Sequence, residues 1–200
     1  MAWRYEIRLA GSGGQGIILA GIILAEAAGI HDGKYVCQTQ SYGPEARGGA
    51  SKAEVIISDA EIDYPKAMRP DALLAMNQAS LNIYLGDVKP GGLVMVDEAY
   101  VTESPGAAAI ALPFTRLARE ELGKVMAANI AALGALAVLS QAVSPQALEA
   151  AVLARAPSGT QELNRQALAL GMAAARRYQE TLLKSPPGAT PPLADKEDSD

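Results

Sequence analysis

Short segments with alternating apolar residues and longer, mostly apolar segments follow one another through the first half of the chain. Tyr5, Ile7 and Leu9 occupy alternate positions, which predicts a first strand. The nearly all-apolar residues 17–28 contain no proline and predict a helix directly after it. This succession is typical of parallel strands joined by crossover helices. We therefore predict an α/β fold, a Rossmann-like three-layer domain with a mostly parallel sheet.

The same pattern predicts further elements along the chain. Strands are expected at residues 35–40, 52–58, 72–76, 93–97 and 110–112. Helices are expected at residues 78–85, 115–122, 127–143, 145–154 and 160–183. Ser144 followed by Pro145 is a typical helix start. The C-terminal third is thus predicted to be helical, with small residues along 131–137 that allow close helix packing.

Length and composition indicate one domain and a tail. The chain has 200 residues, half of them hydrophobic, which suffices for one core. We predict one domain over residues 1–184. Residues 185–200 are rich in proline and acidic residues and are predicted to be a disordered tail.

Charge and cysteine content narrow the function classes. The net charge of -5, without a basic stripe, disfavours nucleic acid as a partner. Residues 127–143 include Asn129 and Gln141, so a buried helix is favoured over a membrane span. Without a secretory pattern, the cytoplasm is the expected location. The single cysteine, Cys37, excludes an internal disulfide and cannot supply a four-thiolate cluster, so a partner would hold any iron–sulfur centre.

A glycine turn between the first strand and the first helix is the clearest candidate site. It comprises Gly11, Ser12, Gly13, Gly14, Gln15 and Gly16. Gly11, Gly13 and Gly16 match the G-x-G-x-x-G pattern, which brings backbone amides and the positive end of a helix to an anionic group. A nicotinamide site would also need an acidic residue about 20 positions later, whereas residues 35–40 end in uncharged side chains. The alternative is a turn that serves only tight strand-to-helix packing.

A second glycine-rich segment, residues 41–49, follows the second strand. Because strand ends share one edge of such a sheet, Arg47 and Lys52 are expected to face the glycine turn. Arg47 could bind a phosphate or carboxylate, and Gly48 and Gly49 would admit a ligand or a neighbouring subunit. The alternative is a surface pair of Glu45 with Arg47 that stiffens a loop.

These two segments resemble those of a known family, the gamma subunits of 2-oxoacid:ferredoxin oxidoreductases. The resemblance covers about residues 5–177 and is strongest for the 2-oxoglutarate branch. It is carried by residues 11–16, 40–51 and 62–65, together with Asn129 and 133–135. Such enzymes decarboxylate a 2-oxoacid oxidatively with coenzyme A, giving an acyl-CoA and carbon dioxide and reducing ferredoxin.

The resemblance implies a division of labour among subunits. Thiamine diphosphate, Mg²⁺ and the iron–sulfur clusters would belong to alpha, beta and ferredoxin-like delta subunits, and this chain would bind no cofactor alone. It would aid coenzyme A access and assembly through Gly11 to Gly16, Ser41, Arg47, Gly48 and Gly49, without catalytic or metal-binding residues. Two alternatives remain open: a stand-alone oxidoreductase that binds NAD(P) or flavin, and a purely structural subunit.

Overall fold

The computed structural model describes residues 2–42, 50–103 and 109–184. The strands are β1 (Arg4–Ser12), β2 (Tyr35–Ser41), β3 (Ala50–Ser58), β4 (Ala72–Ala75), β5 (Leu93–Asp97) and β6 (Ile110–Leu112). The α-helices are α1 (Ile17–Glu26), α2 (Gln78–Tyr84), α3 (Phe114–Glu120), α4 (Ala128–Ser140), α5 (Pro145–Arg155) and α6 (Gln161–Lys184). A π-helix, η1 (Ala27–His31), extends α1, and short 3₁₀ turns are η2 (Leu85–Asp87) and η3 (Val125–Ala127).

Within these residues the strands form one sheet in the order β2-β3-β1-β4-β5-β6. The pairs β1–β4, β4–β5 and β5–β6 are parallel, as predicted. β3 runs antiparallel to both β1 and β2, which the sequence analysis did not anticipate. The physical reason is the length of the connection: only residues 42–49 separate β2 from β3, fewer than the roughly dozen residues that a crossover between parallel strands needs.

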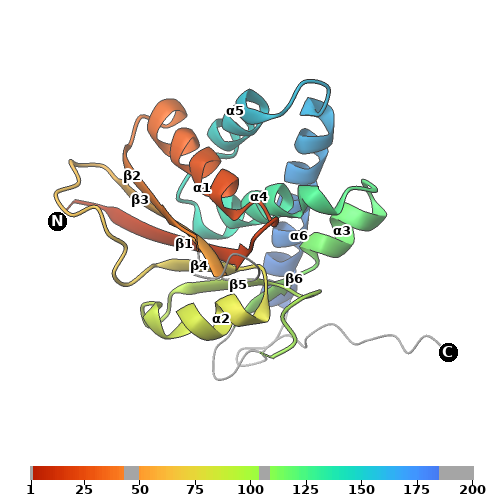
Figure 1. The fold of residues 1–200 in the computed structure, drawn as a ribbon, viewed down its shortest axis with the longest axis horizontal. Helices are drawn as coiled ribbons and strands as arrows, with labels where there is room; N and C mark the ends of the chain where they lie inside the picture. Colours follow the sequence, from red (N-terminus) through yellow and green to blue (C-terminus); the bar gives the residue numbers. More distant parts are fainter. Residues whose placement is uncertain (1, 43–49, 104–108, 185–200) are drawn as a thin grey trace.

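The two faces of the sheet are covered differently, which gives the three-layer architecture (Figure 1). Ile7, Leu9 and Val55 point to one face, where they join residues of α1, α4 and α6 in the larger core. Leu73 and Val96 point to the other face and pack with Leu81 of α2 in a smaller core. The predicted fold class is therefore confirmed.

On the larger face, α4 and α6 lie in close contact at glycines. A Cβ atom at Gly171 would lie 1.7 Å from the Ala131 carbonyl oxygen, and one at Gly134 would lie 2.3 Å from that of Leu168. Residues 128–137 of α4 are all buried. The small residues of α4 thus serve packing within the chain, as their pattern indicated.

On the face toward α2, the sheet carries buried charges. Arg8 is 4% exposed and donates to Glu54 at 2.7 Å, to the Ala67 carbonyl oxygen at 3.2 Å, and to Asp87. Its guanidinium also lies over the Tyr84 ring, 5.0 Å from the centroid. These contacts pair a charge that burial alone would destabilise.

The element predictions are confirmed to within a few residues at each end. No helix of the described residues is both long and apolar enough to cross a lipid bilayer. His31 is exposed at the end of η1. The predicted tail, residues 185–200, lies outside the described residues, and the domain boundary at 184 stays a prediction.

Candidate functional site

The glycine turn lies at the point where the connections of the parallel strands change faces. β1 and β4 are neighbours, but α1 follows β1 onto the larger face and α2 follows β4 onto the opposite one (Figure 1). In open α/β sheets, ligands bind outside the carboxyl ends of strands at such a switch point. Residues 11–16 therefore occupy the position where this architecture places a binding crevice.

Packing and backbone conformation explain why the turn needs glycine. A Cβ atom at Gly11 would lie 2.6 Å from Gln15 Oε1 and 2.9 Å from Ile17 Cγ1. Gly16 has φ +70°, and a Cβ there would lie 2.3 Å from Asn129 Nδ2. Gly13, in contrast, has no atom within 4 Å of a built Cβ. The turn is thus tightly held at Gly11 and Gly16, and it has open space at Gly13.

The glycine that ends the turn and the glycine that brings α1 close to the sheet are different residues. Gly16 meets α4, where Asn129 Nδ2 donates to the Gly16 carbonyl oxygen at 3.2 Å. Close contact between α1 and the sheet occurs at Gly21, whose built Cβ would lie 2.5 Å from Ala53 Cβ. The difference arises because the start of α4 packs against the turn, which local sequence does not reveal.

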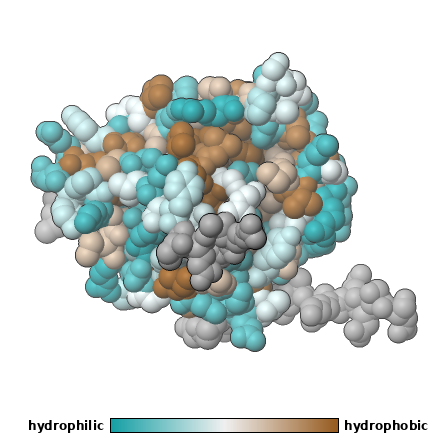
Figure 2. Space-filling model, in the orientation of Figure 1, coloured by the Kyte–Doolittle hydropathy of each residue, from teal (hydrophilic) through white to brown (hydrophobic). Residues whose placement is uncertain are grey.

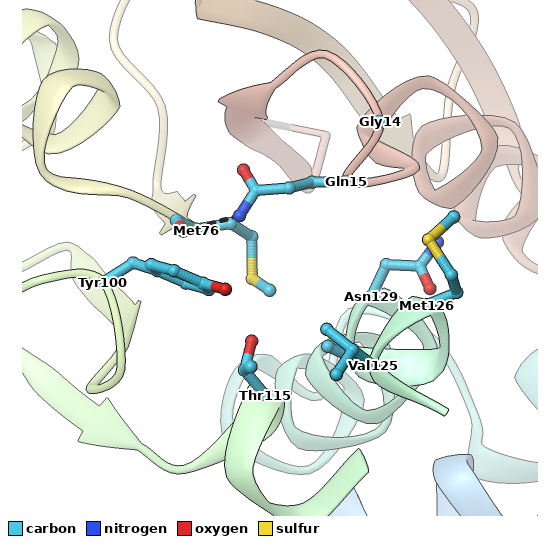
Figure 3. A pocket seen from close by; sticks show the side chains of 9 residues that line it. Gly14, Gln15, Met76, Tyr100, Thr115, Val125, Met126 and Asn129 are labelled. Carbon is cyan, nitrogen blue, oxygen red and sulfur yellow. Dashed lines mark hydrogen bonds between the residues drawn. The ribbon is translucent and has the colours of Figure 1, made fainter. Parts of the chain in front are cut away.

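Polar side chains join the ends of β1 and β4 across the switch point. Gln15 accepts from the Ser12 amide at 2.7 Å and donates to the Met76 carbonyl oxygen at 3.0 Å (Figure 3). Asn77 donates to Ser12 Oγ at 2.6 Å and caps α2 by accepting from the Ser80 amide at 2.8 Å. These bonds hold the turn in one geometry before any ligand arrives.

The start of α1 has no compensating negative charge. Its N-cap is Gly16, without a side-chain hydrogen bond, and no acidic residue lies in its first turn. Peptide amides at such an end favour an anion. The electrostatics of this end therefore agree with the predicted preference for a phosphate or carboxylate.

A small pocket opens beside the turn, with a volume of about 70 Å³. Its lining includes Gln15, Met76, Tyr100, Thr115 and Asn129. The hydroxyl groups of Tyr100 and Thr115 point toward the Met76 side chain (Figure 3). Since a cavity of about 10–15 Å³ in this measure holds one water molecule, the pocket admits a few waters or a small group, and a nucleotide would have to extend outside it.

A buried carboxylate that was not predicted from the sequence, that of Asp97, holds one wall of this pocket. Asp97 ends β5 with 0% exposure and accepts hydrogen bonds from the Thr115 hydroxyl, the Thr115 amide and the Ala99 amide. Burial raises the pKa of Asp97, and the hydrogen bond from the Thr115 hydroxyl is the largest opposing effect. Asp97 thereby caps α3 and fixes the wall that carries Thr115. An aspartate at the end of an apolar strand was the available signal.

The second glycine-rich segment starts and ends at the same edge as the turn. In the sheet register Ser41 is opposite Lys52, and Ala50 is opposite Ser12. Ser41 is exposed at the end of β2. Arg47, Gly48 and Gly49 lie outside the described residues, so their predicted contacts stay predictions.

Lys52 does not face the glycine turn as expected. Its ammonium group lies 3.2 Å from Glu54 Oε1 and 5.6 Å from the centre of the Tyr84 ring. Alternation along β3 directs this side chain to the α2 side of the sheet, where the buried carboxylate attracts it. Of the two predicted cations, only Arg47 remains a candidate for the turn.

A Rossmann-like α/β domain with a glycine turn at its switch point is the class that fold and site define. Residues 6–174 match the pyruvate ferredoxin/flavodoxin oxidoreductase family, and the chain belongs to that family. The match spans both the glycine turn and α4, so it includes the whole candidate site.

Named relatives refine this placement. The chain is 49% identical over 177 residues to 2-oxoglutarate synthase subunit KorC of Methanocaldococcus jannaschii, covering 86% of this chain and 95% of the relative. Its structure resembles the keto/oxoacid ferredoxin oxidoreductase gamma subunit of Geobacter sulfurreducens, with TM-score 0.82, 48% identity, and coverage of 88% and 98%.

A larger protein contains the same fold. The 2-oxoglutarate:ferredoxin oxidoreductase of Magnetococcus marinus, solved with 2-oxoglutarate, coenzyme A and succinyl-CoA bound, matches with TM-score 0.77 and 25% identity. The match covers 87% of this chain but only 31% of that one. In that protein the fold is therefore one part of a longer polypeptide.

Proposed function

We propose that the chain is the gamma subunit of a 2-oxoglutarate:ferredoxin oxidoreductase. The complex would convert a 2-oxoacid and coenzyme A to an acyl-CoA and carbon dioxide, with transfer of two electrons to ferredoxin. The observation that carries the proposal is the 49% identity over 95% of a relative named as a 2-oxoglutarate synthase subunit. The cytoplasm remains the predicted location.

The chemistry of oxidation would belong to companion subunits. Thiamine diphosphate with Mg²⁺, the iron–sulfur clusters and the docking of ferredoxin would lie on alpha, beta and delta subunits. Among the described residues, no three His, Cys, Asp or Glu side chains gather in a way that could hold a metal ion. The residues of this chain are therefore proposed to bind and orient, and no oxidation step is assigned to them.

The proposed contribution of this chain is to guide coenzyme A. The uncapped start of α1 and the open space at Gly13 would receive an anionic group of the cofactor. Ser41, Arg47, Gly48 and Gly49 would shape the entry or contact a neighbouring subunit. The bonds of Gln15 and Asn77 support this role because they keep the turn preorganised.

Substrate identity is tested on the assembled complex. The chain is co-expressed with its companion subunits, and ferredoxin reduction is followed with 2-oxoglutarate, pyruvate and branched 2-oxoacids in the presence of coenzyme A. We expect the highest kcat/KM with 2-oxoglutarate. A higher value with pyruvate would reassign the complex to another branch of the family.

The glycine turn is tested by Gly13→Asp with Gly86→Asp as matched control. Both glycines are exposed and have open space for a Cβ atom. A carboxylate at position 13 would repel an anion, so KM for coenzyme A should rise about tenfold with little change in kcat. Equal KM values for the two variants would remove the turn from coenzyme A binding.

Arg47 is tested by Arg47→Ala and Arg47→Lys in the same complex. Loss of the bidentate guanidinium should raise KM for coenzyme A in both variants, and more in Arg47→Ala, where the charge is also lost. If KM and assembly stay unchanged, Arg47 has no ligand role. Micromolar binding of NADH or a flavin to the isolated chain in calorimetry would instead favour a stand-alone oxidoreductase.

A further inference from the structure

The outward face of α1 and η1 is apolar except for Glu26 and the terminal His31. Residues 17–25 contain no charged or hydrogen-bonding side chain, and Glu26 is the first ionisable group of the helix. Leu19 is 41% exposed and Ile30 is 72% exposed, while Ile18, Ile22 and Ala25 are partly exposed between them. A helix that is apolar all round normally lies in an interior, but here one side lies at the surface.

The spacing of these residues forms one continuous stripe. Ile18, Ile22 and Ala25 follow one another at intervals of four and three residues, and Leu19 and Ile30 flank them on the same face. Figure 2 shows hydrophobic residues gathered in the upper half of the visible surface, where Figure 1 places α1 and α4. We call residues 18, 19, 22, 25 and 30 the α1 stripe.

The one carboxylate within the span of the stripe, Glu26, is already neutralised by a cation of this chain. Arg155 of α5 donates from Nε to both carboxylate oxygens of Glu26, at 3.0 and 2.9 Å. A partner that covers the stripe therefore need not supply a cation. Other surface helices differ, since α6 presents Glu162, Arg165 and Gln166 in its exposed ion pairs and hydrogen bonds.

The size of the stripe limits what can cover it. From residue 18 to residue 30 it measures about 18 Å by 10 Å at helical rise and width, whereas stable interfaces bury roughly 800 Å² on each partner. Two copies joined only at their stripes would fall well short of that area. The occupant must extend beyond the stripe onto neighbouring surface.

We infer that the α1 stripe is the apolar centre of the interface with a companion polypeptide of the oxidoreductase; this inference rests on the proposed function. In the Magnetococcus marinus protein the matching fold is 31% of a longer chain, so further protein accompanies it in the same molecule. In the KorC relative, matched over 95% of its length, the fold is a separate subunit. A separate subunit is held to its companions by a noncovalent interface, and the buried centre of such an interface is more apolar than its rim. The α1 stripe has this character.

The test compares two double variants in the full complex. Leu19→Gln/Ile30→Gln removes two exposed apolar side chains from the stripe without adding charge near the glycine turn. Ile83→Gln/Leu182→Gln does the same at α2 and at the end of α6, where the residues are 57% and 41% exposed. The dissociation constant of each variant is measured by titration onto companion subunits purified without this chain.

We expect the stripe variant to bind about tenfold or more weakly and the control to stay within about twofold of the unmodified chain. Equal affinities for both variants, or no binding of the unmodified chain, would overturn the inference. A dimer of the isolated chain that dissociates in the stripe variant would assign the stripe to a second copy. A lower Tm of the isolated stripe variant with unchanged affinity would mean that the chain covers the stripe itself, which also overturns it.

Failure of the proposed function gives a different result. The unmodified complex would then assemble, with the stripe variant still weakened, but would reduce no ferredoxin with 2-oxoglutarate. Affinity and turnover thus report the two proposals separately.

Discussion

The two faces of the sheet bury their residues by different means. Toward α4 and α6 the contacts are apolar, and helices meet at Gly134 and Gly171 with almost no space between backbones. Toward α2, β1 and β3 carry Arg8 and Glu54, which are buried and joined by a hydrogen bond, and the buried Glu6, which accepts from the Arg4 side chain and the Arg69 amide. The first face depends on shape and the second on complete pairing of charge, so they should fail under different substitutions.

The largest effect is expected where α4 and α6 meet. Gly171→Leu would place side-chain atoms on the Ala131 carbonyl oxygen, which a Cβ alone would approach to 1.7 Å. The helices must separate, and the free energy of unfolding should fall by about 4 kcal/mol. Urea titration of the isolated chain measures it. Gly86→Ala, where the space is open, should change the value by less than about 0.5 kcal/mol, and similar losses for both would contradict the packing argument.

The charged face should be sensitive to the loss of one partner rather than both. Arg8→Met leaves the buried Glu54 with the half-buried Lys52 at 3.2 Å and the Thr39 hydroxyl at 3.5 Å, and should lower the free energy of unfolding by about 3 kcal/mol. Arg8→Met/Glu54→Leu replaces both charges by apolar groups and should recover most of that loss. If Arg8→Met/Glu54→Leu is instead less stable than Arg8→Met, pairing of charge is not what stabilises this face.

A smaller, pH-dependent effect on the free energy of unfolding is expected at Asp97, the last residue of β5. Burial raises the pKa of Asp97 in the folded protein above its ordinary value of 3.8. The folded state then binds more protons between these two pKa values, so this group lowers stability as pH rises through that window and restores it as pH falls. Asp97→Asn removes this titration. Chemical denaturation measures the free energy of unfolding of both chains. The value for the unmodified chain minus that for the variant should increase on going from pH 7 to pH 4.

Local pattern was sufficient for most of the architecture. Segments with the apolar pattern of a strand and segments with that of a helix follow one another and are bounded by glycine and proline. Their positions could therefore be predicted from residues such as Ile7, Pro90 and Pro145. The direction of β3 was missed, although the predicted strands at residues 35–40 and 52–58 are closer in sequence than a crossover between parallel strands allows. The same error misplaced Lys52, whose side chain follows the strand to the opposite face.

The candidate site was found only in part for a similar reason. The glycines of the turn carry a local signal, since strand, turn and helix are adjacent in sequence. Gln15, Asn77, Asp97 and Thr115 act through contacts between distant segments, such as the bond from Asn77 to Ser12. Their roles depend on the three-dimensional arrangement, and no short-range spacing reveals them.

The register that pairs Ser12 with Ala50 has a consequence for changes in the length of the segment between Ser41 and Ala50. Because side chains alternate along a strand, a slip of one residue in β3 would turn Glu54 toward α1 and Val55 toward α2, which the core forbids. Insertions or deletions between Ser41 and Ala50 would therefore leave the ladder intact. The ends of β1, β2 and β3 thus keep their positions relative to one another, whatever the length of the segment between Ser41 and Ala50.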